Sequence, residues 1–182
     1  MFTAYGSKAT NLAELKRILP SVTPDGYAIP FYFYHEFMLH NGFYSEATQM
    51  INDELFRKFP SVREKRLKEF RKRIKDIGIL PGWMLEKLRA MQDSFENGIT
   101  LRARSSTNNE DLQGFNGAGL YESYSHYPDE GHFSKTAKQV WAGLWTYRAF
   151  EEREFWKIDH LTASMGILVH PCLLYTSDAA DE

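Results

Sequence analysis

The sequence predicts a mixed α+β fold, because amphipathic helical patterns alternate along it with short runs of β-prone residues. The clearest helical pattern is the apolar spacing of three and four within Thr10–Leu19. The clearest β-prone runs are Tyr27–Ile29, Ile99–Ala103 and Met165–Val169. A length of 182 residues suits one domain of ordinary size, with room for two small lobes.

The first part of the chain is predicted to fold as a helix, a strand and a second helix. Thr10–Leu19 places its apolar residues on one face, and Pro20 ends the pattern. Tyr27–Ile29 follows a turn signal and is stopped by Pro30, so we expect a short strand there. Phe31–Asn41 carries apolar residues at helical spacing, which predicts the second helix.

A basic amphipathic helix is expected within Ile51–Ile79, where apolar residues recur every three or four positions from Leu67 onwards. Its outer face is rich in basic residues from Arg63 to Lys75. A nucleic-acid surface is one interpretation of this face. Acidic residues interrupt it and no stacking aromatics are interleaved with it, so a solvated helix face is favoured. Met84–Phe95 is predicted as a further helix.

The second half of the chain is predicted to combine strands, a loop and one long helix. Ile99–Ala103 and Tyr121–Ser125 are expected to be strands, separated by a loop over residues 105–119 that is rich in Ser, Asn and Gly. Phe133–Phe155 is predicted to be a single helix, and Met165–Val169 a buried strand. The large residues of the long helix that we assign to the core are Trp141 and Trp145.

Composition and charge exclude several classes of function. The formal net charge is -2, which argues against bulk attraction to nucleic acid or to an anionic membrane. The sequence contains no run of eighteen apolar residues, so no membrane span is predicted. Its first residues do not resemble a secretory signal. Cys172 is the one cysteine, so no internal disulfide forms and a reducing, cytoplasmic location is expected.

The last residues, CLLYTSDAADE, look like the translation of an adapter used in preparing sequencing libraries. They continue no helix or strand period, and we exclude them from the fold in the way that an expression scar is excluded. The expected division is therefore a partial domain over residues 1–171 and a non-native tail over residues 172–182. A genuine polar tail is the alternative. We expect the natural protein to continue past Pro171, which would make this chain a fragment.

The segment with the densest chemical signal runs from Leu101 to Tyr124. Arg104 stands where the predicted strand enters the loop, and Ser105 adds a hydroxyl beside it. Guanidinium groups match phosphate oxygens, and glycines let backbone N–H groups approach an anion. The glycines of this segment are Gly114, Gly117 and Gly119. Their spacing matches neither a Walker loop nor a Rossmann fingerprint, so a phosphate cradle and a surface loop with a salt-bridging arginine both stay open.

Several motifs resemble those of phosphoenolpyruvate synthases, pyruvate phosphate dikinases and related dikinases. RSSTNNEDL is similar to the family's Arg-Ser-Ser-Ala-Thr-x-Glu-Asp-Leu signature, and AGLYESY resembles its Ala-Gly-x-x-Glu-Thr-Phe motif. GSKATNL resembles the opening Gly-Gly-Lys-Gly/Ala-x-Asn-Leu motif, with Ser7 in place of the second glycine. The further matches, in family order, are residues 22–29, 138–141 and 148–150.

The resemblance implies part of an ATP-grasp fold, the N-terminal lobe of the dikinase nucleotide-binding domain. It implies that Lys8 and Arg104 contact the phosphates of ATP and serve the chemistry. The other residues it suggests as nucleotide contacts are Ser105, Gly117, Gly119, Ser123 and Arg148. The segment Thr107–Asn109 departs from the family signature, which leaves the subfamily and the phosphoryl acceptor open.

The activity implied by the resemblance is that of a phosphotransferase with paired acceptors. ATP would phosphorylate a histidine on a separate domain, and the phosphoryl group would pass to pyruvate to give phosphoenolpyruvate. Mg²⁺ would bridge the phosphates, with its ligands in a part of the family domain that has no match here, so we assign no metal ligand. The alternatives are another acceptor, such as a glucan or an antibiotic, and a noncatalytic nucleotide-binding module.

Two further expectations concern the histidines and the exposed apolar surface. The six histidines are predicted to be surface or core residues. None lies in a phosphohistidine motif, and the spacing of His35 and His40 makes no zinc site without further ligands. A lobe that lacks its partner is expected to expose apolar surface. The residues expected to be exposed are Ile167, Leu168 and Val169.

Overall fold

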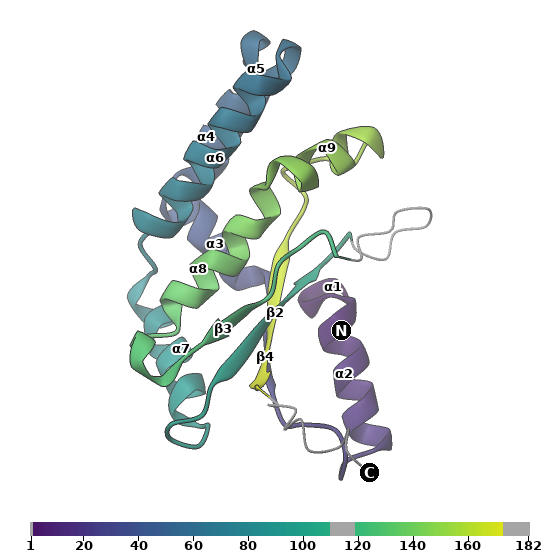
Figure 1. Cartoon of the computed structure of the whole chain (residues 1–182), viewed down its shortest axis with the longest axis vertical. Helices are drawn as coiled ribbons and strands as arrows, with labels where there is room; N and C mark the ends of the chain where they lie inside the picture. Colours follow the sequence, from purple (N-terminus) through teal and green to yellow (C-terminus); the bar gives the residue numbers. More distant parts are fainter. Residues whose placement is uncertain (1, 110–118, 173–182) are drawn as a thin grey trace, which may run out of the picture.

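A single four-stranded sheet organises the chain in the computed structural model, which describes residues 2–109 and 119–172 (Figure 1). The strand order is β1-β4-β2-β3, and every neighbouring pair is antiparallel. The strands are β1 (Tyr27–Ile29), β2 (Leu101–Thr107), β3 (Tyr124–His126) and β4 (Met165–Pro171). Helices cover the sheet, so the predicted mixed α+β fold is confirmed.

The pairing of β2 with β4 is the longest in the sheet and runs from Leu101↔Pro171 to Thr107↔Met165. The short strand β1 pairs with the other edge of β4, with Ile29 opposite Ile167. β4 therefore lies between two strands that precede it in the sequence. Side chains alternate between the faces of a strand, so β4 contributes to both faces of the sheet.

Helices pack on both faces of the sheet. α1 and α2 lie on one side of the sheet, and α3 and α8 pack against the strands on the other side (Figure 1). α4, α5 and α6 extend away from the sheet as an arm. The helices are α1 (Phe2–Tyr5), α2 (Ser7–Ile18), α3 (Phe31–His40), α4 (Phe43–Asn52), α5 (Glu54–Lys58), α6 (Pro60–Asp76), α7 (Gly82–Asp93), α8 (Ser134–Ala142) and α9 (Tyr147–Phe155), with 3-10 turns η1 (Pro128–Glu130) and η2 (Gly143–Trp145). In the described ranges, no helix combines the length and the apolar character needed to cross a bilayer.

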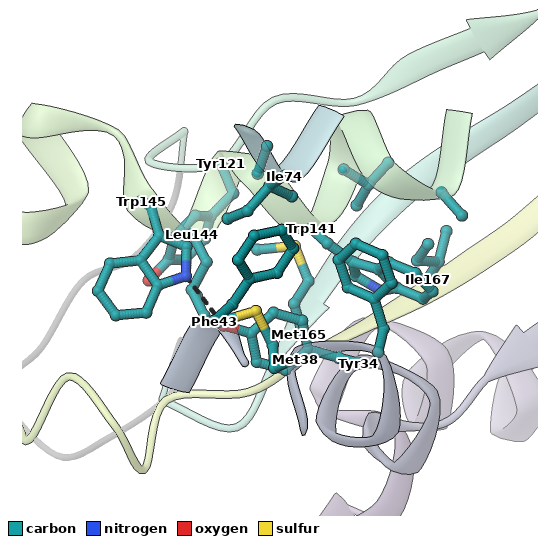
Figure 2. Packing of buried hydrophobic residues seen from close by; sticks show 14 of the residues in the cluster. Tyr34, Met38, Phe43, Ile74, Tyr121, Trp141, Leu144, Trp145, Met165 and Ile167 are labelled. Carbon is teal, nitrogen blue, oxygen red and sulfur yellow. Dashed lines mark hydrogen bonds between the residues drawn. The ribbon is translucent and has the colours of Figure 1, made fainter. Parts of the chain in front are cut away.

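The core lies between the sheet and the helices α3, α6 and α8, and it is built largely from aromatic rings (Figure 2). Trp141 and Trp145 are fully buried, so their predicted core role is confirmed. The indole N–H of Trp145 donates to the hydroxyl of Tyr34 at 3.0 Å. The rings of Phe70 and Trp145 meet edge to face, with centroids 5.0 Å apart. Such offset ring pairs add to the stabilisation that burial provides.

The prediction of one helix over Phe133–Phe155 was wrong. α8 ends at Ala142, the turn η2 follows, and α9 begins only after Thr146. The backbone of Thr146 is extended, and its hydroxyl accepts a hydrogen bond from the N–H of Ala149 at 3.2 Å. A threonine cap of this kind starts a new helix, although the apolar spacing continues across it.

The long helical pattern of Ile51–Ile79 is likewise divided. α5 begins after Asp53, whose carboxylate accepts from the N–H of Phe56 at 3.0 Å. α6 begins at Pro60, which suits the first turn of a helix because proline lacks the N–H that would be unsatisfied there. The basic face predicted near Lys75 lies on α6.

The expected exposure of Ile167, Leu168 and Val169 is also wrong. All three are buried, because β4 is an inner strand of the sheet and helices cover both of its faces. Large apolar side chains are exposed elsewhere, such as Val22 after α2 and Phe155 at the end of α9.

Gly6 lets α2 approach β2 closely. Its φ of 79° and ψ of 172° lie in a region that only glycine adopts readily. A Cβ atom on this residue would lie 2.5 Å from the hydroxyl oxygen of Ser106 and 2.8 Å from the carbonyl oxygen of Thr107.

We predict that Gly6→Ala lowers the free energy of unfolding by about 3 kcal/mol, through backbone strain and a steric clash. Gly42→Ala is the control, because Gly42 also has a positive φ, of 68°, but nothing within 4 Å of an added Cβ. Gly42→Ala should lower the free energy of unfolding by about 1 kcal/mol, from backbone strain alone. Urea unfolding of both variants measures the difference, and equal losses would contradict the close approach of α2 to β2.

Candidate functional site

β2 continues through Thr107, so the loop predicted to begin at Ser105 begins later. Residues alternate across the strand, and Arg104 and Ser106 therefore share the face that α2 covers. Arg104 is exposed on that face. Ser105 points to the opposite face, where its hydroxyl is fully buried and has no hydrogen-bond partner in the described chain. The side chain of Ser105 is thus separated from that of Arg104 by the thickness of the sheet.

The first turn of α2 is fixed to the face of β2 that carries Arg104. The N–H of Ala9 donates to the hydroxyl of Ser106 at 3.4 Å. Lys8 precedes Ala9 in this turn, and Arg104 lies two residues before Ser106 along the strand. The fold therefore places Lys8 and Arg104, far apart in the sequence, on the same side of the sheet. The positive end of the α2 dipole lies at the same place.

The remaining predicted nucleotide contacts are spread over other elements. Gly117 and Gly114 lie outside the described residues. Gly119 is exposed, with a φ of 72° and open space around the position of a Cβ. Ser123 is half-buried directly before β3. Arg148 is exposed in the first turn of α9, a helix that packs against α6 and η2.

A buried arginine that the sequence reasoning missed lies on α9. Arg153 is fully buried, and its guanidinium donates to the carbonyl of Leu144 at 2.8 Å and to Nδ1 of His160 at 3.0 Å. It also donates to the hydroxyl of Tyr121 at 3.4 Å and lies over the ring of Trp145. The feature of the sequence that indicates its burial is its position four residues after Ala149, on the apolar stripe of the helix.

The hydrogen bonds of His160 determine its tautomer. Arg153 Nε can only donate, so His160 Nδ1 accepts and the proton lies on Nε2. That N–H donates to the carboxylate of Glu154 at 2.7 Å, and the ring stacks on Phe150. Burial, followed by the neighbouring Arg153 charge, lowers the pKa of His160 below its usual 6.5, against the opposing pull of Glu154. The fold therefore holds this histidine neutral.

Metal-ligating side chains are not clustered in the part of the chain that the structure describes. Among residues 2–109 and 119–172, no group of three or more His, Cys, Asp or Glu side chains could hold a metal ion. The chemistry that these residues offer is positive charge and N–H donors on one face of the sheet. We therefore derive no step through a metal from them.

This geometry, with two cations and a helix N-terminus on one sheet face, is that of a domain able to hold an anionic ligand. The class of ligand follows from a family comparison. The family described as pyruvate phosphate dikinase, AMP/ATP-binding domain, matches residues 3–173, and the chain belongs to it. It is thus a nucleotide-binding domain of the dikinase type.

One curated relative is the phosphoenolpyruvate synthase of Aeropyrum pernix, which is 28% identical over 173 residues. The match covers 90% of this chain and 20% of that protein. The chain therefore spans about a fifth of the length of this relative.

The neutral His160 predicts a dependence of stability on pH. The pKa of His160 is lower in the folded chain than its usual 6.5, so below pH 6.5 the unfolded chain takes up more protons at this residue. Acid therefore lowers the free energy of unfolding. Above 6.5 this contribution is complete. His160→Asn keeps an acceptor for Arg153 and removes the titration.

We predict that the free energy of unfolding falls less steeply in His160→Asn than in the wild type between about pH 7.5 and about pH 5.5. Other groups, such as the buried His126, titrate equally in both proteins and cancel in the comparison. Denaturant unfolding across this range measures both slopes. Identical slopes would show that His160 is protonated as easily in the folded chain as in the unfolded one.

Proposed function

We propose that this chain is the ATP-binding part of a dikinase that makes phosphoenolpyruvate, and that Lys8 and Arg104 hold the phosphates of ATP. The observation that carries the proposal is the contact of the α2 N-terminus with Ser106, which brings both cations to one sheet face. Membership of the AMP/ATP-binding family supports the nucleotide as ligand. A part of an ATP-grasp fold is the architecture we propose for the domain.

The proposed role of these residues is electrostatic. ATP carries several negative charges on its phosphates, and phosphoryl transfer depends mainly on positioning those groups and neutralising their charge. Arg104 offers a planar fork of donors, Lys8 a compact ammonium, and the first turn of α2 the positive end of a helix dipole. Gly119 and Ser123, with Gly117 of the segment between them and β2, would close over the phosphates. Arg148 is the least supported contact, because its helix packs elsewhere.

The later steps of the reaction are proposed for the longer protein. The phosphoryl group would move to a histidine on a separate domain and then to pyruvate. Pyruvate is the preferred acceptor because the relative from Aeropyrum pernix is a phosphoenolpyruvate synthase. Mg²⁺ would be held by residues outside those described here, and a cytoplasmic location fits an enzyme that uses ATP and pyruvate.

We predict that Arg104→Ala and Lys8→Ala each weaken ATP binding to this chain by about tenfold or more, because a hydrogen bond between charged groups is lost. Two variants serve as matched controls. Arg102→Ala removes an arginine from the same face of β2, where its guanidinium donates to Ser125. Lys16→Ala removes a lysine from the far end of α2, where it pairs with Asp25.

Titration calorimetry with ATP measures all four variants. The controls should bind nearly as well as the wild type. If all four bind alike, the two cations do not hold the phosphates. If the wild type binds no ATP, the proposed function itself is wrong for this chain.

In the longer dikinase, Arg104→Ala should reduce ATP-dependent phosphorylation of the histidine by at least about a hundredfold, because the cation also stabilises charge during transfer. Labelled ATP and acid-labile phosphohistidine detection measure the rate. A normal rate in this variant, with Arg102→Ala as control, would exclude Arg104 from the chemistry.

A further inference from the structure

The turn that joins α1 to α2 is in close contact with two neighbouring residues of the sheet. Ser106 of β2 and Gly166 of β4 are opposite each other in the ladder, so they lie on the same face. A Cβ atom added to Gly166 would lie 3.1 Å from the carbonyl oxygen of Tyr5, the last residue of α1. A Cβ atom added to Gly6 would lie 2.5 Å from the hydroxyl oxygen of Ser106. The turn is therefore packed tightly on both strands.

The first turn of α2 takes its capping oxygen from β2. Gly6 is the N-cap residue and has no side chain that could accept a hydrogen bond. The N–H of Ala9, the third residue of the helix, donates instead to the hydroxyl of Ser106 at 3.4 Å. A serine or threonine at the N-cap usually accepts this bond from within its own helix. Ser106 thus supplies from a distant strand the cap that Gly6 lacks.

The capping hydroxyl connects the elements that carry the two proposed phosphate-binding cations. Arg104 precedes Ser106 by two residues and shares its face of β2. Lys8 directly precedes Ala9 in the first turn of α2. One hydroxyl therefore joins the strand of the first cation to the helical turn of the second. Ser106 is fully buried, so it can affect a ligand only through the residues around it.

The neighbouring serine has different surroundings. Ser105 is also fully buried, but it points to the opposite face of the sheet. It lies opposite Ile167 in β4, and its hydroxyl has no hydrogen-bond partner in the described chain. Of the two adjacent serines, Ser106 is therefore the one that can act on α2.

We propose that Ser106 is a positioning residue for the phosphates of ATP, and that it acts by holding Lys8 at a fixed place relative to Arg104. This inference rests on the proposed function, because it takes both cations as phosphate contacts. The side chain of Lys8 is flexible, so the place of its helical turn limits where its ammonium can reach. Loss of the hydroxyl should loosen this turn and leave Arg104, which is on the strand itself, in place. The effect on ATP should therefore depend on the presence of Lys8.

The test is a double-mutant cycle with a matched control. Ser106→Ala removes the capping hydroxyl, and Ser105→Ala removes an adjacent buried hydroxyl from the other face of the same strand. Ser106→Ala is also combined with Lys8→Ala and, separately, with Arg104→Ala, because coupling between two residues shows as non-additive losses. Ser106→Cys is the conservative variant, since its sulfur is a weaker acceptor of about the same position.

Titration calorimetry measures the ATP affinity of each variant, and urea unfolding shows that each is folded under the conditions of the titration. Ser106→Ala should bind ATP about fivefold more weakly, as expected for one ordinary hydrogen bond, and Ser106→Cys should be intermediate. Ser105→Ala should bind like the wild type. In the Lys8→Ala background the Ser106→Ala loss should shrink to less than about twofold, whereas in the Arg104→Ala background it should stay near about fivefold.

The same loss in the Lys8→Ala background as in the wild type would overturn the inference, because the hydroxyl would then act without Lys8. Wild-type affinity in Ser106→Ala, or a loss that vanishes in the Arg104→Ala background, would overturn it as well. If Ser106→Ala does not fold, Ser106→Cys carried through the same cycle decides the question. In each case a wild type that binds ATP, and binds it more weakly after Lys8→Ala, leaves the proposed function standing. A wild type that binds no ATP contradicts the proposed function itself.

Discussion

The antiparallel pairing of β2 with β4 is the constraint on which the arrangement of this domain depends. It extends over the whole of β2, from Leu101 to Thr107. On one face it supports the aromatic core around Trp141 and Trp145, and on the other it supports α2 through Ser106. The same ladder supports the layers on both faces of the sheet. A shift of its register by one residue would therefore exchange the two faces of β2 and move Arg104 away from the sheet face on which Lys8 lies.

The two sides of the sheet perform different tasks. The α2 side is polar at the end of β2 and presents positive charge, while the opposite side buries rings and one guanidinium. Arg104 and Arg153 illustrate the difference, since the first is exposed and the second is fully buried. An exposed arginine can exchange its water for a ligand, whereas a buried one is already committed to protein acceptors. The binding role that we propose and the structural role therefore fall to different arginines.

Local signals in the sequence predicted which segments form helices and strands. They predicted less well where these elements end and how they are arranged. Tyr27–Ile29 was predicted with its observed bounds because Pro30 stops the strand. The break between α8 and α9 was missed because apolar spacing continues through η2, and only the cap at Thr146 reveals it. The order of the strands depends on pairings between distant segments, which no local pattern contains. Arg153 was not predicted to be buried, although it lies on the apolar stripe of α9.

The place of β4 in the sheet bears on how the protein is made. Ribosomes release the chain from its N-terminus, so β1 and β2 emerge long before the strand that must lie between them. Until β4 begins to leave the exit tunnel, the ladder that joins them cannot form, and the strand edges that β4 will cover stay open to other chains. Helices such as α6 can form early from local contacts, but closure of the sheet waits for β4. The strand order therefore leaves one edge of β1 and one edge of β2 unpaired until β4 arrives.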